Sequence, residues 1–155
     1  MCLPERGKTM NIRKFTSQDY NAAYSLWQNT PGVSVRKYDD SEAEIIKFLD
    51  RNPNTCFIVE LQGRTPADNQ IIGTIMGGND GRRGYIYHLT VAENYRNQGI
   101  GKMLVDKVIE AFKNEGLPKI ALFCLNENTG GNSFWEKYGF EVMDEAVTWA
   151  MRFID

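Results

Sequence analysis

The sequence is poor in the residues that build metal centres and disulfide frameworks. It has one histidine and three cysteines, and Cys2, Cys56 and Cys124 are widely spaced with no C-x-x-C pair among them. An odd number of separated cysteines argues against a disulfide framework and, with a single histidine, against a zinc site. We therefore expect reduced thiols, as in a cytoplasmic protein, and no bound metal.

Long apolar runs and a large excess of one charge are also missing. No apolar run approaches the length of a membrane span, and the polar first ten residues lack the apolar segment of a signal peptide. The formal net charge is −2, so no global basic field attracts nucleic acid or anionic lipid. The sequence predicts a cytoplasmic protein without a nucleic-acid or membrane partner.

What is present is typical of one globular domain. The chain has 155 residues, of which 42% are hydrophobic, and a chain of this size can bury a core without disulfides or metals. The first strand is expected directly after Met10. We therefore interpret Met10 as the natural start, residues 1–9 as a flexible extension and residues 10–155 as one domain.

Apolar periodicity and turn residues predict an alternating series of helices and strands. The expected elements are a strand at 11–14, a helix from the N-cap Thr16 to about Asn29, a helix after Asp40 or Ser41 ending near Asn52, strands at 56–61, 71–76 and 85–91, a helix from about Gln98 to Glu115, a strand at 119–125, a helix at 128–138 and two strands within 140–153. The passage from Tyr85 to Leu125 implies a right-handed parallel crossover. The predicted fold class is α/β, with a mixed, mostly antiparallel sheet flanked by helices in the order β-α-α-β-β-β-α-β-α-β-β.

One loop carries the clearest chemical pattern. A strand ending Leu89-Thr90-Val91 leads into Arg96-Asn97-Gln98-Gly99-Ile100-Gly101-Lys102, where a helix begins at two glycines. Free N–H groups at a helix start attract phosphate, and glycine lets a pyrophosphate approach the backbone. The alternative is an ordinary glycine-containing turn. A dinucleotide-binding fingerprint and a P-loop are both excluded, because Leu104 replaces the third glycine and Met103 follows Lys102.

Two segments resemble motifs of the GNAT superfamily of acetyl-CoA-dependent N-acyltransferases. Residues 96–101 match its (Gln/Arg)-x-x-Gly-x-(Gly/Ala) signature, and residues 128–140 resemble its N-x-x-A-x-x-F-Y-x-x-x-G-F segment. The element order matches from about Met10 to Phe153. Within the superfamily the sequence is most similar to small bacterial acetyltransferases of the ribosomal-protein alanine type. The resemblance implies that the two central strands splay apart.

The resemblance implies a role for each matching position. Residues 98–102 would bind the CoA pyrophosphate through their amides, with Arg96 and Asn97 in the same loop. The strand Leu89-Thr90-Val91 would pair with the pantetheine arm, and the Leu89 amide would polarise the thioester carbonyl. Asn128 would contact the pantetheine arm or hold the splayed strands, and Phe134 would pack near the cofactor.

The sequence departs from the family pattern at two catalytic positions. Trp135 replaces the tyrosine that usually acts as general acid, and Phe123 replaces the glutamate base of the ribosomal-protein type. Tyr138, one helical turn on from Trp135, is a candidate acid or else a packing residue. His88 is a candidate base acting through water, or else a structural residue or part of the acceptor wall.

Three further features have a structural and a functional interpretation. Asp39 and Asp40 could attract a cationic acceptor, although helix capping explains them as well. Trp27, Arg36 and Tyr38 surround a loop that commonly forms the acceptor wall in this fold, and a plain surface loop is the alternative. Cys124 is interpreted as a buried strand thiol rather than a nucleophile.

The leading hypothesis is acetyl transfer from acetyl-CoA to a primary amine, by direct attack in a ternary complex. The alternative is an acyl-CoA-binding sensor or partner module without turnover, which Trp135 and Phe123 would favour. Acylation with a longer chain is a third possibility. The acceptor, whether a small molecule or a protein, is not identified by the sequence, and a homodimer is possible because this fold often dimerises.

Overall fold

The computed structural model describes residues 8–144 and 147–153. Its described residues form two compact units that divide between Phe123 and Cys124. Most of the extension expected at residues 1–9 lies outside the described residues. Among those residues, no helix has the length and apolar character needed to cross a membrane.

The first unit is built on a five-stranded sheet with the order β1-β2-β3-β4-β5. Its strands are β1 (Met10–Lys14), β2 (Cys56–Leu61), β3 (Gln70–Asn79), β4 (Gly84–Val91) and β5 (Ile120–Leu122). The first four pair antiparallel, and β4 pairs with β5 in parallel. This is the mixed, mostly antiparallel sheet that the sequence predicts, including the parallel crossover.

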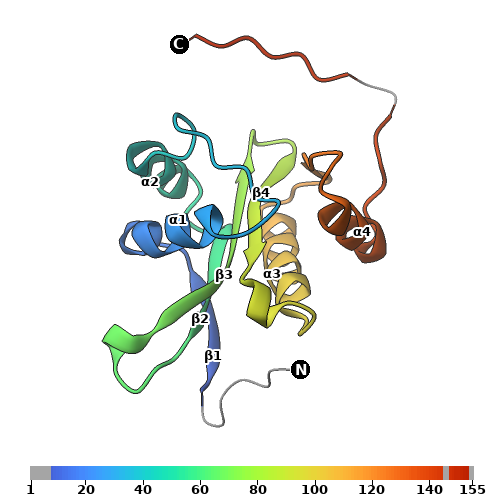
Figure 1. Cartoon of the computed structure of the whole chain (residues 1–155). Coiled ribbons are helices and arrows are strands. Elements are labelled where there is room, and N and C mark those ends of the chain that lie inside the picture. The colour runs from blue at the N-terminus through green and yellow to red at the C-terminus, as the bar shows by residue number, and fades with distance from the viewer. Residues whose placement is uncertain (1–7, 145–146, 154–155) are drawn as a thin grey trace. The chain divides into compact units, whose positions relative to one another are not determined.

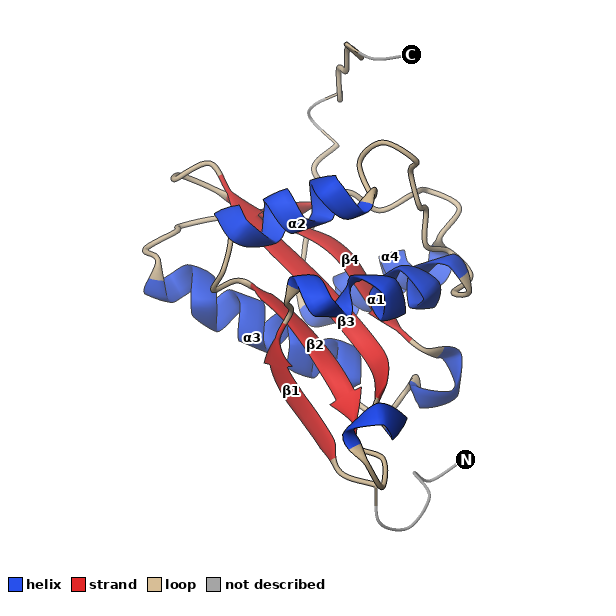
Figure 2. Ribbon diagram, turned by 90° about the vertical axis from the view of Figure 1, so that its left-hand side faces the viewer, coloured by secondary structure: helices blue, strands red, loops and turns tan. Residues whose placement is uncertain are grey.

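Helices cover both faces of this sheet. The helices α1 (Tyr20–Gln28) and α2 (Glu42–Arg51) lie on one face, and α3 (Ile100–Asn114) lies on the other (Figures 1 and 2). Three short 3₁₀ turns, η1 (Ser17–Asp19), η2 (Pro66–Asp68) and η3 (Glu93–Tyr95), connect the elements. The buried core beneath α1 and α2 includes Trp27, Ile45 and Ile58.

The helix starts follow local capping chemistry. Thr16 and Asp19 form the expected capping box, although the first turn is the 3₁₀ turn η1 and α1 begins only at Tyr20. Ser41 caps α2 by accepting a hydrogen bond from the Glu44 amide, so Ser41 rather than Asp40 is the N-cap. In α3 the expected apolar positions are buried except Met103, which is 41% exposed.

The strand β3 runs three residues beyond the predicted end at Met76, through Gly77 and Gly78. The sequence suggests a turn there, but both glycines serve close packing instead. A Cβ at Gly77 would lie 2.7 Å from the carbonyl oxygen of Thr55, and one at Gly78 would lie 2.7 Å from the Phe48 ring. Glycine therefore lets α2 and α3 approach the sheet at this end of β3.

Two predictions for the later part of the chain are wrong in the described residues. The strand expected at 119–125 is only β5, because its ladder with β4 ends at the pair Ile86–Leu122. The two strands expected within 140–153 are absent from 140–144 and 147–153. Val147, Trp149, Met151 and Phe153 alternate as in a strand but are 75%, 89%, 81% and 90% exposed. Apolar alternation marks a segment that can form a strand, but a strand also requires a neighbouring backbone to pair with.

The second unit is organised around α4 (Thr129–Tyr138). Asn128 caps its start by accepting a hydrogen bond from the Gly131 amide at 2.9 Å. Gly139 ends it in the left-handed conformation with φ 112°, which is the predicted C-terminal signal. The aromatic rings of Phe134, Trp135 and Phe140 contact one another along and after this helix.

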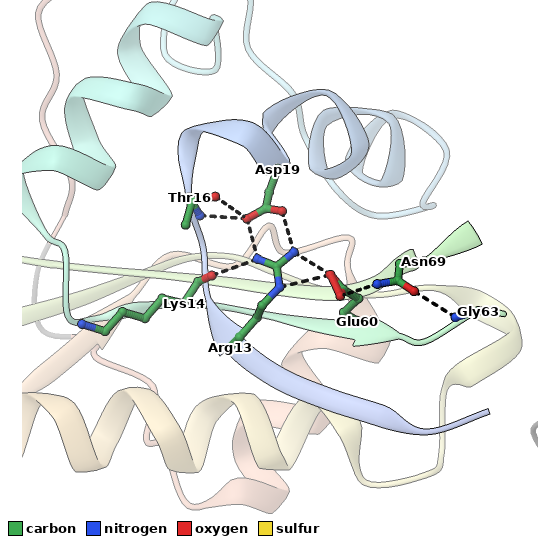
Figure 3. A network of polar contacts seen from close by, with 7 residues as sticks. All are labelled: Arg13, Lys14, Thr16, Asp19, Glu60, Gly63 and Asn69. Atoms are coloured by element: carbon green, nitrogen blue, oxygen red, sulfur yellow. Dashed lines mark hydrogen bonds and ion pairs between the residues drawn. The ribbon is translucent and has the colours of Figure 1, made fainter. Parts of the chain in front are cut away.

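An arginine joins β1, η1 and β2 at the sheet edge (Figure 3). The Arg13 guanidinium donates two hydrogen bonds of 2.8 Å to Asp19 and two, of 2.6 and 3.1 Å, to Glu60. Burial would raise the pKa of Asp19, but the hydrogen bonds from Arg13 and Thr16 outweigh it and hold that pKa below the ordinary value of 3.8. The ionised carboxylate therefore stabilises the fold above about pH 4 and loses this contribution as the pH falls further.

We expect Arg13→Met to lower the free energy of unfolding by about 2 kcal/mol at pH 7, because it leaves two partly buried carboxylates without their donor. Chemical denaturation should show this loss shrinking as the pH falls below 4 and through the lowered pKa of Asp19, because the protonated carboxyl no longer pairs with Arg13. Lys47→Met is the control, since it breaks an exposed ion pair with Glu44 and should change stability by less than about 0.5 kcal/mol. Equal effects of the two substitutions would contradict the structural role of Arg13.

Candidate functional site

The loop between β4 and α3 is the first component of the candidate site. After Val91 the chain passes through η3 and adopts positive φ angles at Asn97 (59°) and Gly99 (81°). Asparagine and glycine are the residues that accept this conformation most readily. The loop therefore turns sharply and delivers the chain into α3 at Ile100.

The start of α3 presents uncapped backbone donors. Met103 donates its amide hydrogen to the Gly99 carbonyl at 3.0 Å, and the amides of Ile100 and Gly101 before it have no acceptor inside the helix. No side chain caps this end. A Cβ at Gly99 would meet nothing within 4 Å, so the space beside this glycine is open. Such a helix start can hold an anionic group such as phosphate.

The cationic side chains of the loop have protein partners. Arg96 Nε donates to the Val91 carbonyl oxygen at 3.2 Å, which ties the loop back to the end of β4. Lys102 pairs with Asp106 across one helical turn at 2.7 Å. The Gln98 side chain donates to the Asn94 carbonyl oxygen at 3.4 Å. These contacts shape the loop, and the amides of Ile100 and Gly101 at the start of α3 are the donors that an anion could use.

A β-bulge interrupts β4 next to Leu89. The register between β3 and β4 shifts after Thr74, and His88 lies in the bulge with a positive φ of 47°. Beyond Ile86, no strand of the described residues pairs with the edge of β4 that faces β5. The ladder between β4 and β5 thus ends before Leu89, Thr90 and Val91, whereas the sequence predicts that the two parallel strands diverge only beyond Val91.

A polar and aromatic network surrounds His88 within the first unit. His88 Nε2 lies 2.6 Å from Asp40 Oδ1, and the imidazole stacks on the Trp27 indole with centroids 4.1 Å apart. Thr74 Oγ1 accepts from Trp27 Nε1 at 2.8 Å and donates to the His88 carbonyl oxygen at 2.8 Å. The backbone and the ring of His88 are therefore both fixed by buried partners.

Asp40 is the residue in this network that the sequence interpretation misplaced. It is neither a solvated residue nor the α2 cap but is 95% buried, and its second oxygen accepts from the Arg36 amide at 2.6 Å. Burial would raise the pKa of Asp40, yet the hydrogen bonds from His88 and from the Arg36 amide hold that pKa below its usual value. Asp39 remains exposed, 3.7 Å from the Arg36 guanidinium.

The residues proposed for an acceptor wall do not share one environment. Trp27 is fully buried, so its indole belongs to the core beneath His88 rather than to an open wall. Tyr38 is 47% exposed, and the Arg36 side chain is exposed as well. The loop before α2 thus keeps two exposed candidates for contacts with a second substrate.

Three predicted site residues belong to the second unit. Asn128 caps α4, and the ring of Phe134 lies between those of Trp135 and Tyr138. The Tyr138 ring also contacts Phe140, with centroids 5.8 Å apart. Tyr138 therefore has the packing contacts that one of its two interpretations requires.

Phe123 is the last residue of the first unit, and Cys124 is the first residue of the second. The Phe123 ring is 69% exposed and stacks on Tyr85. Cys124 is only partly buried, and burial raises the pKa of its thiol, so a thiolate nucleophile is disfavoured there. Across the described residues, no group of three or more His, Cys, Asp or Glu side chains is arranged to hold a metal.

Sequence reasoning missed Asp40 and Thr74 as partners of His88. Their separations from His88 in the chain are 48 and 14 residues, so no local motif links them. One signal in the sequence pointed to Asp40. Ser41, which follows the acidic pair 39–40, is sufficient as the N-cap of the helix, so capping does not explain why an aspartate precedes it.

Comparison with known proteins adds family information to this geometry. The model of the family described as Acetyltransferase (GNAT) family matches residues 18–140, which include the loop, the bulge and α4. An acetyltransferase of Sodalis glossinidius is 31% identical over 146 residues, covering 94% of this chain and 97% of its own length.

Solved structures share the fold. The PaiA N-acetyltransferase of Thermoplasma acidophilum, in complex with coenzyme A, superposes with a TM-score of 0.72 at 19% identity, covering 88% of this chain and 92% of its own. AAC(6')-Iy, in complex with the bisubstrate analogue CoA-S-monomethyl-acetylneamine, gives a TM-score of 0.67 at 20% identity. The match covers 92% of this chain and 99% of that one.

Thr74→Val tests the network under the bulge. We expect a loss of about 2 kcal/mol in the free energy of unfolding, because Trp27 Nε1 and the His88 carbonyl both lose a buried partner. Thr55→Val is a matched control, since its buried hydroxyl donates to the Gly77 carbonyl oxygen and its loss should cost about 1 kcal/mol. Urea denaturation measures both, and a Thr74 variant no less stable than the Thr55 variant would contradict the bridge.

Proposed function

The chain belongs to the acetyltransferase (GNAT) family and is an N-acetyltransferase, and we propose that it transfers the acetyl group of acetyl-CoA to a primary amine by direct attack in a ternary complex. The observation that carries the proposal is the uncapped start of α3, with Gly99 in the left-handed conformation and open space beside it. Backbone donors in this arrangement suit the pyrophosphate of CoA.

The residues of the loop fit this cosubstrate. Residues 98–102 would hold the pyrophosphate through their amides, and Arg96 and Asn97 would shape the loop around it. The edge of β4 at Leu89, Thr90 and Val91 would pair with the pantetheine arm, because no described strand occupies that edge. This pairing resembles the addition of a strand to an open sheet edge.

The chemistry supplied by the bound cosubstrate is that of a thioester, whose acetyl carbon accepts a nucleophile. In this proposal the Leu89 amide polarises the thioester carbonyl, as an oxyanion-type donor would. Direct attack is supported by the partial burial and raised thiol pKa of Cys124, which disfavour an acetyl-cysteine intermediate. The bisubstrate analogue bound to AAC(6')-Iy is consistent with both substrates sharing one site in this fold.

Asn128 and Phe134 remain proposed contacts of the cosubstrate, and Tyr138 remains the proposed general acid. The acid is not indispensable, because a thiol has a reference pKa of about 8.5 and its thiolate leaves readily near neutral pH. A cytoplasmic location, a homodimer and the absence of metal and nucleic-acid partners stay predictions. The acceptor class is left open between a small molecule and a protein.

A panel of primary amines tests the function. The purified protein should release free CoA thiol from acetyl-CoA in the presence of at least one acceptor, faster than without an amine. The rate should rise with pH as the amine loses its proton. Binding of acetyl-CoA in calorimetry without acetylation of any amine would instead support the sensor alternative.

Gly99→Ala should weaken CoA binding at least tenfold, because a methyl group would enter the path of the pyrophosphate. Gly116→Ala is a matched control: Gly116 lies just beyond the other end of α3, also has a positive φ (75°), and a Cβ there also meets nothing within 4 Å. Both variants should therefore lose similar stability, about 1–2 kcal/mol.

Isothermal titration with CoA and thermal melts separate the two effects. The Gly116 variant should bind CoA like the wild type despite its lower melting temperature. If Gly99→Ala also retains wild-type affinity, the proposed position of the pyrophosphate is wrong.

A further inference from the structure

His88 is next to Leu89, whose amide is proposed to polarise the thioester carbonyl. It immediately precedes Leu89 in the chain and lies in the bulge with φ 47°. Residues other than glycine are uncommon in this backbone region and pay a conformational cost there. The surrounding contacts nevertheless hold it in one orientation, stacked on Trp27 with only 13% of its side chain exposed.

The contact with Asp40 determines which ring nitrogen carries the proton. Asp40 is ionised at neutral pH, since its pKa lies below the ordinary carboxyl value. An ionised carboxylate only accepts hydrogen bonds, so His88 Nε2 must be the donor at 2.6 Å. In the neutral imidazole this leaves the lone pair on Nδ1, where it can accept a proton.

The Nδ1 atom has no protein partner among the described residues, whose buried side-chain nitrogens and oxygens all have one. Nδ1 is therefore accessible to solvent. The pair thus leaves one ring nitrogen accessible while the carboxylate binds the other. Asp40 is itself held by the Arg36 amide, and its backbone carbonyl accepts a hydrogen bond from the Tyr20 hydroxyl at 2.9 Å.

We propose that His88 is the general base of the acetyl transfer, acting through Nδ1 directly or through one water, and that Asp40 is the residue that positions it. This inference rests on the proposed acetyltransferase function. It assigns a general base to a chain in which Phe123 replaces the glutamate that serves as the base in the ribosomal-protein type. The stacking on Trp27 and the bond from Thr74 keep the ring and its backbone in place.

The step balances without any further reactant. The amine nitrogen forms a bond to the acetyl carbon, the carbon–sulfur bond breaks, and sulfur leaves with the electron pair as a thiolate. The proton lost by the amine moves to His88 Nδ1, which gives an imidazolium facing the Asp40 carboxylate. Proton release to water, or transfer to the thiolate, restores the neutral ring.

The charged and titratable groups around the pair come from three elements. Asp40 and Arg36 belong to the loop before α2, Tyr20 and Tyr24 to α1, and Glu42 to the start of α2. Tyr20 donates to the Asp40 backbone, and burial raises the pKa of its phenol, so it stays neutral at the pH of the reaction. Among these groups, only the Asp40 carboxylate is within hydrogen-bond distance of the imidazole.

Kinetics of two near-isosteric variants test the assignment. His88→Asn keeps a residue that tolerates positive φ and an amide that can donate to Asp40, but it has no base. We expect its kcat to fall about a hundredfold to ten-thousandfold with an unchanged KM for acetyl-CoA. Asp40→Asn can still accept from the Arg36 amide, but its NH₂ donates to Nε2 and forces the proton onto Nδ1. Its kcat should fall at least tenfold.

The pH–rate profile separates positioning from stability. The pH dependence of kcat/KM in Asp40→Asn should differ from that of the wild type, because the imidazolium formed in the step no longer faces a carboxylate. Asp39→Asn is the control: it removes the same charge from the adjacent exposed position and should retain wild-type rates and profile. Wild-type kcat and profile in Asp40→Asn, with only a lower melting temperature, would show a purely structural role.

The single histidine of the chain allows a test that needs no variant. Long-range ¹⁵N–¹H spectra of the wild type at pH 8 should show the Nε2–H form of the ring. The Nδ1–H form would overturn the proposal even if a variant fails to fold. Absence of turnover by the wild type on all amines would instead refute the proposed function itself, whatever the tautomer.

Discussion

The bulge in β4 is the constraint on which the site depends. Side chains alternate between the two faces of a strand, so one extra residue moves the side chains that follow it to the opposite faces of the sheet. Here the extra residue is His88, whose carbonyl turns toward the Thr74 hydroxyl on β3 and whose ring turns toward α1. The same irregularity precedes Leu89, the position from which an amide could face a carbonyl beside the sheet.

The bulge persists because buried partners compensate its backbone strain. A non-glycine residue with positive φ costs on the order of 1–3 kcal/mol and survives only where its surroundings fix it. Thr74 binds the carbonyl, Asp40 binds the ring, and Trp27 covers one ring face from the core. Residues that stabilise the fold therefore also orient the imidazole, so packing and positioning cannot be separated at Trp27.

Local signals in the sequence predicted the parts of the structure that local chemistry determines. The capping box at Thr16, the left-handed Gly139 and the glycines before α3 all act within a few residues of themselves, and they lie where expected. The role of Asp40 could not be predicted in this way. Its partner is 48 residues away, and only the packing of the α1–α2 loop against the sheet brings the two together.

Patterns with two physical explanations caused the errors in the fold. The pair Gly77-Gly78 is typical of a turn, but a strand uses it where an adjacent ring or carbonyl leaves no room for a Cβ. Apolar alternation over 147–153 is typical of a strand, but it does not supply the backbone partner. In both cases the deciding factor is a neighbour that is distant in sequence.

The allocation of charge around Asp40 also limits how an acceptor can be recognised. A buried carboxylate that already accepts from His88 and from the Arg36 amide is not available to attract a cationic amine. The negative charge of Asp40 instead stabilises the imidazolium that forms when His88 takes a proton from the amine. An ammonium entering the same partly buried region would lose hydration without gaining that partner. The site is thus suited to an amine that has lost its proton, and recognition of the acceptor falls to exposed groups such as Tyr38 and Arg36.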